Sequence, residues 1–166
     1  MEFTAAKATD LNEVTALYRA AIERMNAQGI DQWDERYPTR KILAGDIVRG
    51  EMGLLQMEGR VAAAFTLNDR CDAAYALGAW RLPSARYCVI HRLCVHPAFQ
   101  GHGVAGRVMD HIERTLRTGD FESIRLDAFS QNPFALRLYE KRGYEKVGEV
   151  SFRKGLFFLY EKTLQP

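Results

Sequence analysis

The segment from Val95 to Ala105 constrains the fold more than any other part of the chain. An apolar run typical of a strand extends from Tyr87 to Val95 and ends just before Pro97. A loop containing Gly101 and Gly103 follows, and a helical pattern begins after it. A helix N-terminus carries unpaired N–H groups and the positive end of the helix dipole, and glycines let a bulky anion approach the main chain. The segment therefore predicts a strand, a phosphate-binding loop and a helix in direct succession.

This loop differs from the common nucleotide-binding loops. It lacks the Lys-Ser/Thr ending of a P-loop, and its glycines do not fit the G-x-G-x-x-G pattern of dinucleotide-binding proteins. It reads instead as Gln-x-x-Gly-x-Ala, from Gln100 through Gly103 to Ala105. An ordinary glycine-rich turn between a strand and a helix would also fit these six residues, so the interpretation depends on the rest of the chain.

Hydrophobic periodicity divides the chain into strands and helices. Strands are expected at 2–8, 52–57, 60–67, 85–95, 123–129, 144–152 and 156–163, with a hairpin turn at Glu58-Gly59 and a loop at 68–84. Helices are expected after a capping box of Asp10 and Glu13, after a Thr39 cap, at 101–118 and at 133–142. This order predicts an α/β protein whose strands run in mixed directions.

Composition narrows the class of protein. The chain has 166 residues, of which 47% are hydrophobic, and this suits one domain with a substantial core. A net charge of +2 gives no basic field for nucleic acid, and no apolar run approaches the ~18 residues of a membrane span. Three cysteines without metal-ligand spacing suit a reducing cytoplasm, and no metal is expected.

A second motif runs from Asn132 to Tyr144 and reads Asn-x-x-Ala-x-x-x-Tyr-x-x-x-Gly-Tyr. Together with the Gln100 loop it resembles the two coenzyme A signatures of the GNAT family of N-acetyltransferases. The order of strands and helices resembles that family over nearly the whole chain. The resemblance implies the GNAT acyl-CoA N-acyltransferase fold, an α/β fold with a central mixed β-sheet flanked by helices, and a single N-acetyltransferase domain over residues 1–166.

The resemblance also implies an activity, the transfer of an acetyl group from acetyl-coenzyme A to a primary amine by direct attack. Loop amides would bind the pyrophosphate, the strand before the loop would pair with the pantetheine arm like an added strand, and Asn132 would bond a pantetheine amide. The coenzyme residues expected on this basis are Leu93, Cys94, Val95, Gln100, Gly101, His102, Gly103, Val104, Ala105 and Asn132.

Two residues are candidates for proton transfer. Tyr139 matches the family position that protonates the departing thiolate; alternatively, it is a core aromatic residue. His91 lies in the strand 85–95, where alternation would place it on the same face as Leu93, and a histidine can accept a proton near neutral pH. A buried structural histidine, or deprotonation of the amine by water, are the alternatives.

The acceptor side is expected in the two irregular segments, at Trp33, Tyr37 and Trp80. These aromatic residues could equally anchor their loops to the core. The sequence leaves open whether the acceptor is a small molecule or a peptide, and whether the late strands pair in a homodimer. The alternatives to acetyl transfer are a non-catalytic coenzyme A-binding regulatory domain, transfer of a larger acyl group, and an acyl-enzyme route through Cys94.

Overall fold

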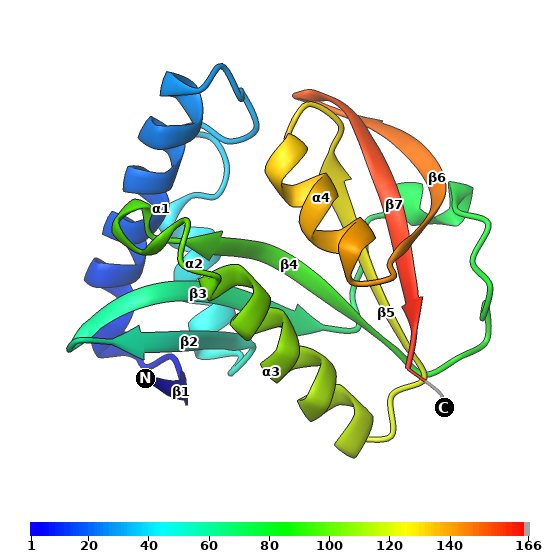
Figure 1. Ribbon diagram of the computed structural model, residues 1–166, viewed down its shortest axis with the longest axis horizontal. Coiled ribbons are helices and arrows are strands. Elements are labelled where there is room, and N and C mark those ends of the chain that lie inside the picture. The colour runs from blue at the N-terminus through cyan, green and yellow to red at the C-terminus, as the bar shows by residue number, and fades with distance from the viewer. Residues whose placement is uncertain (165–166) are drawn as a thin grey trace. The chain divides into compact units, whose positions relative to one another are not determined.

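The computed structural model describes residues 1–164, and Figure 1 shows the course of the chain. Its strands are β1 (Glu2–Ala5), β2 (Met52–Met57), β3 (Arg60–Asn68), β4 (Tyr87–Val95), β5 (Ser123–Phe129), β6 (Glu145–Phe152) and β7 (Gly155–Thr163). Its α-helices are α1 (Leu11–Ala27), α2 (Arg40–Val48), α3 (Val104–Thr118) and α4 (Pro133–Lys141). Three short 3-10 helices are η1 (Ala8–Asp10), η2 (Ala73–Leu77) and η3 (Pro97–Phe99).

The seven strands form one mixed sheet in the order β1-β2-β3-β4-β5-β7-β6. Strand β4 pairs with β5 in parallel, whereas β5 and β6 pair with β7 in antiparallel fashion. The predicted fold class, a mixed sheet with flanking helices, is thus confirmed. The parallel ladder has three pairs and ends at Val89 and Arg125, although β4 runs on to Val95. These pairs therefore involve only the first three of the nine residues of β4.

By contacts the chain groups into two compact units, of which the first comprises residues 1–67 and 91–108. Its core lies between α1, α2 and β2–β3, and the side chains of Val14, Leu17 and Tyr18 on one face of α1 are at most 1% exposed. Thr39 caps α2 as predicted, because its Oγ1 accepts a hydrogen bond from the Ile42 N–H. The buried residues Leu43 and Ile47 of α2 belong to the same core.

The second unit comprises residues 68–90 and 109–164. Strand β5 is almost fully buried, and β7 pairs with it over its whole length, from Ser123↔Thr163 to Phe129↔Phe157. Helix α4 contacts β5 and begins with Pro133 in its first turn, as predicted from the sequence. The paired strands β5 and β7 therefore form much of the interior of this unit.

Several boundaries differ from the sequence predictions. Strand β1 ends at Ala5, and residues 8–10 form η1. The expected capping box is wrong, because Asp10 accepts a hydrogen bond from the Lys7 N–H and Glu13 accepts one from the Val61 N–H. The expected loop at 68–84 contains η2. Among residues 1–164, no helix has both the length and the apolar character that crossing a membrane requires.

Candidate active site

The loop between β4 and α3 has an exposed and unobstructed main chain. Gly101 and Gly103 have φ angles of 80° and 73°, and a Cβ added at either would meet no atom within 4 Å. Gln100 donates a hydrogen bond from Nε2 to the Val95 carbonyl at 3.0 Å, which ties the loop to the end of β4. His102 is exposed, whereas Val104 is buried where α3 begins and Ala105 is half-buried. The residues therefore fit a large anion, whose oxygens amide groups of this loop and of the first turn of α3 could bind.

Strand β4 is interrupted at Arg92, whose φ is 53°, in the left-handed region that non-glycine residues rarely adopt. Side-chain alternation assumes extended residues throughout, so the shared face of His91 and Leu93 stays a prediction. Leu93 and Val95 are half-buried, whereas Cys94 is buried.

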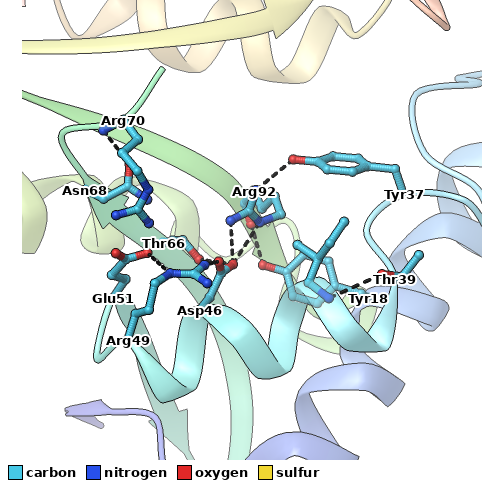
Figure 2. Close-up of polar contacts among 11 residues, drawn as sticks. Tyr18, Tyr37, Thr39, Asp46, Arg49, Glu51, Thr66, Asn68, Arg70 and Arg92 are labelled. Carbon is cyan, nitrogen blue, oxygen red and sulfur yellow. Dashed lines mark hydrogen bonds and ion pairs between the residues drawn. The ribbon is translucent and has the colours of Figure 1, made fainter. Parts of the chain in front are cut away.

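A network of hydrogen bonds holds Arg92 in this conformation, as Figure 2 shows. Its Nε and Nη2 atoms donate to Asp46 Oδ2 on α2, at 3.0 and 2.5 Å. Its Nη1 atom donates to the Tyr37 hydroxyl at 2.8 Å. Its carbonyl accepts a hydrogen bond from the Tyr18 hydroxyl at 2.6 Å. Both the side chain and the main chain of Arg92 are thus fixed.

Asp46 is fully buried, and its two carboxylate oxygens have different partners. Oδ2 accepts from Arg92 and from the Thr66 hydroxyl, whereas Oδ1 accepts from Arg49 at 2.7 Å. Sequence reasoning missed both Asp46 and Arg92. The sequence did contain an indication of both residues. Asp46 lies on the face of α2 that carries Leu43 and Ile47, and Arg92 lies in an apolar strand. A charge at an inward position is rarely tolerated without a partner.

Tyr139 lies on α4 and is only 7% exposed. Its ring packs against those of Tyr144 and Tyr160, at centroid distances of 5.6 and 6.2 Å. Burial raises the pKa of Tyr139, and the charge of Asp127 adds to this effect. The phenol is therefore neutral near neutral pH. This environment suits a proton donor, and it also suits the core aromatic residue that the sequence left as the alternative.

Asn132, the first residue of the second motif, is the N-cap of α4. Its Oδ1 atom accepts a hydrogen bond from the Ala135 N–H at 3.2 Å. The position expected of a ligand contact is thus also that of a helix cap. The capping oxygen is engaged, so any bond to a coenzyme amide would use the side-chain NH₂ group or a lone pair that remains on Oδ1.

The three predicted acceptor aromatics occupy different settings. Trp33 is 9% exposed and belongs to the core of the first unit, where its ring lies 5.6 Å from that of Tyr18. The structure thus favours the anchoring interpretation for Trp33. Tyr37 is half-buried and joins the Arg92 network. Trp80 belongs to the second unit, where it stacks on Tyr75 at 5.5 Å and donates from Nε1 to the Tyr75 carbonyl.

The segment that carries Trp80 is held to β5 by two polar side chains. The Tyr75 hydroxyl donates to Asp127 at 2.6 Å. Arg125, which is 5% exposed, lies over the rings of Trp80 and Tyr87 at 4.4 and 3.9 Å. Anchoring is therefore at least part of the role of Trp80.

The remaining candidates are cysteine and histidine residues. Cys94 is 4% exposed, and burial raises its pKa, so its thiol stays protonated and lacks the reactivity of a thiolate nucleophile. All three cysteines are free thiols, and only Cys71 is exposed. His91 is half-buried in β4. Within residues 1–164, no three His, Cys, Asp or Glu side chains gather in a way that could hold a metal ion.

The comparisons with known proteins agree on one family. The model of the Acetyltransferase (GNAT) family matches residues 33–144. The Bacillus subtilis (strain 168) protein described as uncharacterized N-acetyltransferase YesJ is similar to this chain, with 24% identity over 158 residues that cover 93% of this chain and 86% of the relative.

Solved structures show the same fold. A GNAT-family acetyltransferase from Streptococcus agalactiae superposes with a TM-score of 0.88, at 23% identity, over 99% of this chain and 96% of its own. The PaiA N-acetyltransferase from Thermoplasma acidophilum, solved in complex with coenzyme A, gives a TM-score of 0.74 at 16% identity, over 98% of each chain.

Proposed function

This chain belongs to the Acetyltransferase (GNAT) family and is an acyltransferase, and we propose that it transfers an acetyl group from acetyl-coenzyme A to a primary amine by direct attack. The observation that carries the proposal is the loop Gln100–Gly103, whose exposed left-handed glycines leave their amides open to an anion. The family match runs through residues of both compact units, which supports a single N-acetyltransferase domain over residues 1–166.

Acetyl-coenzyme A would supply an activated acetyl group and a thiolate that leaves. The loop amides at Gly101, His102 and Gly103, with the first turn of α3 at Val104 and Ala105, would bind its pyrophosphate. Main-chain groups of Leu93, Cys94 and Val95 would pair with the pantetheine arm, which needs no particular side chain. The early end of the β4–β5 ladder at Val89 supports this role, because β4 runs on for six residues past its last pair with β5.

Tyr139 would stabilise the departing thiolate from its Oη atom. Its raised pKa keeps the phenol protonated, whereas a thiol titrates near ~8.5, so complete proton transfer to the thiolate is uphill. A hydrogen bond donated by the neutral phenol is the stabilisation that this environment supports best. Replacement of Tyr139 by Phe should slow turnover by on the order of 10²-fold while preserving the packing of the ring.

The measurement for Tyr139→Phe is single-turnover acetyl transfer, where release of product does not limit the rate. Coenzyme affinity should stay at the wild-type value and serves as the control for folding of the site. An unchanged single-turnover rate would assign Tyr139 to the core alone and would mean that another group stabilises the departing thiolate.

His91 is proposed as the base that receives the amine proton, because histidine is the side chain that most readily accepts a proton near neutral pH. His91→Gln keeps the size and part of the hydrogen bonding but does not titrate. We expect the wild-type rate to rise with pH as the base loses its proton, and the variant to lose that inflection. If the variant keeps both the rate and the inflection, the proton leaves through water or another group.

On the acceptor side, Tyr37 and Trp80 are half-buried whereas Trp33 is buried, so they are better candidates than Trp33 for contact with the amine substrate. The acceptor is a small molecule or a peptide with a primary amine. A screen of such amines that follows the release of free thiol would identify it, and acyl-coenzyme A donors of increasing chain length would test whether larger acyl groups are used.

Binding of the coenzyme is the first test of the whole proposal. Acetyl-coenzyme A should raise the thermal unfolding temperature, because a hundredfold excess over the dissociation constant stabilises a fold by roughly 2.7 kcal/mol. Absence of both a thermal shift and a calorimetric heat with millimolar coenzyme would refute the proposal. Binding without turnover on any amine would instead favour a regulatory coenzyme A-binding domain.

A further inference from the structure

Arg92 has a backbone conformation that is unusual for a residue within a strand. Three non-glycine residues among 1–164 have a positive φ: Glu58 in the β2–β3 turn, Asp120 after α3, and Arg92 inside β4. The first two lie in connections, where left-handed residues are common. Arg92 is the one that interrupts a strand. Such a conformation persists only where its surroundings determine it, and it often marks a functional segment.

The surroundings of Arg92 determine its conformation from three elements. Tyr18 on α1 fixes its carbonyl, Asp46 on α2 fixes its guanidinium, and Tyr37 of the segment between these helices accepts the third bond. Glycine would adopt the same backbone conformation at no steric cost. With arginine at this position, the guanidinium is bonded to a carboxylate that α2 supplies.

Stability alone gives a weak reason for this arrangement. Asp46 is fully buried and the Arg92 side chain is 10% exposed, so both charges are removed from water. Well-packed apolar residues of similar volume often stabilise a fold as much as a buried ion pair does. What apolar residues would not provide is a fixed direction, because the guanidinium fork donates along set directions to Asp46 and to Tyr37.

We propose that Asp46 and Arg92 are a positioning pair for acyl transfer, in which Asp46, through Arg92, fixes the main chain of β4 at Leu93 and the hydroxyl of Tyr37. The pair thereby sets two parts of the site at once, the strand assigned to the pantetheine arm and an aromatic assigned to the acceptor. Neither residue touches the reacting atoms. This inference rests on the proposed function.

The test compares Asp46→Asn, Arg92→Lys and Arg92→Gly with Arg49→Ala, at a temperature where circular dichroism shows every variant folded. Asp46→Asn removes the charge, and Arg92→Lys keeps a charge but loses the fork. Arg92→Gly keeps access to the left-handed conformation but loses the side chain. Arg49 is the matched control, because it also bonds Asp46, through Oδ1, but its side chain is 47% exposed.

We expect Asp46→Asn and Arg92→Lys to lower kcat by on the order of 10²-fold, the effect of misplacing reacting groups by about 1 Å. Arg92→Gly should retain coenzyme affinity within about threefold and raise the KM of the amine, because the β4 conformation survives but the support of Tyr37 does not. The double variant Asp46→Asn/Arg92→Gly should be no slower than Arg92→Gly, since the two residues act as one unit. Arg49→Ala should behave like the wild type.

A readout without coenzyme completes the test. Backbone chemical shifts of residues 91–93 should change in Asp46→Asn and stay close to wild type in Arg49→Ala. If folded Asp46→Asn and Arg92→Lys keep the wild-type kcat and shifts, or if Arg49→Ala loses as much activity as they do, the positioning role is refuted while the proposed function stands. If the wild type itself binds no coenzyme, the proposed function fails, and this inference fails with it.

Discussion

Two places in the first unit adopt left-handed backbone conformations for opposite reasons. At Arg92 the conformation is imposed on a bulky residue by a hydrogen bond that its carbonyl accepts from Tyr18 and by those that its guanidinium donates to Asp46 and Tyr37. At Gly101 and Gly103 the conformation has no steric cost, and a Cβ added at either would meet no atom within 4 Å. The same backbone geometry is reached by dense contacts in one case and by the absence of a side chain in the other.

The difference separates two ways of preparing a site. A segment that holds a ligand through its main chain must first be placed, and the buried network around Arg92 does this for the middle of β4. A segment that surrounds a bulky anion must stay unobstructed, and the glycines of the loop do this. Substitutions at the first place should therefore affect folding most, and substitutions at the second should affect binding most.

Arg92→Ala should give the largest loss of stability. It would leave the Asp46 carboxylate buried with only Thr66 and Arg49 as partners, and breaking one side of a buried ion pair costs about 3–5 kcal/mol. Urea denaturation would measure the change in the free energy of unfolding. Arg49→Ala, which removes a half-exposed partner of the same carboxylate, should cost within about 1 kcal/mol.

Equal losses for Arg92→Ala and Arg49→Ala would contradict this comparison. They would mean that water or a shift of α2 compensates Asp46 equally well in both variants, and that the dense network around Arg92 is no more demanding than the surface pair beside it.

Gly103→Val should act mainly on binding. A branched side chain at φ 73° costs about 1–3 kcal/mol of strain wherever it occurs. It should in addition weaken coenzyme binding by tenfold or more, about 1.4 kcal/mol, because its methyl groups enter the space that the phosphates need. Calorimetric titration would measure the dissociation constant.

Gly59→Val is the matched control for Gly103→Val. Gly59 lies in the β2–β3 turn with φ 72°, and a Cβ there would also meet nothing within 4 Å. The two variants should lose similar stability, but Gly59→Val should bind the coenzyme like the wild type. If Gly103→Val also binds normally, the phosphate site lies elsewhere.

The sequence predicted the parts of the fold that depend on local chemistry. The glycines that end α1, α2 and α4 are Gly29, Gly50 and Gly143, and each has a positive φ, as expected of a residue past a helix end. Glu58 and Gly59 both have a positive φ, as a tight hairpin requires. In all these cases a single residue type at one position decides the backbone, so no distant contact is needed to predict it.

The parts that failed depend on distant contacts. Glu13 was expected to close a capping box within its own helix, but it accepts a hydrogen bond from Val61 on β3. A regular strand was expected at 85–95, but Arg92 within it is left-handed. Asp46 lies far from Arg92 in sequence, so no local pattern shows that their charges compensate each other. The roles of the predicted site residues also depend on contacts that no local pattern shows, and they remain proposals.

The smallest effect on stability is expected at the entry to the loop, where the imidazole of His96 caps the start of η3. His96 Nδ1 accepts a hydrogen bond from the Ala98 N–H at 3.1 Å, which requires an unprotonated nitrogen. Burial lowers the pKa of His96, and Arg60 lowers it further against the opposing charge of Glu13. The unfolded chain therefore binds this proton more readily than the folded one.

The stability that His96 contributes should thus be complete above its ordinary pKa of ~6.5 and should be lost as pH falls through the lower folded value. Asparagine in its place keeps an acceptor for the Ala98 N–H but does not titrate. Between pH 7.5 and pH 5, the free energy of unfolding of the wild type should fall by up to about 1 kcal/mol more than that of His96→Asn, the value of one hydrogen bond. Because all other titrating groups are shared, the difference between the two urea curves isolates the imidazole. Identical pH dependences would show that no titratable contact holds the entry to the loop, just as none holds Gly101 and Gly103. The region held by dense hydrogen bonds, such as those around Arg92, would then end at β4.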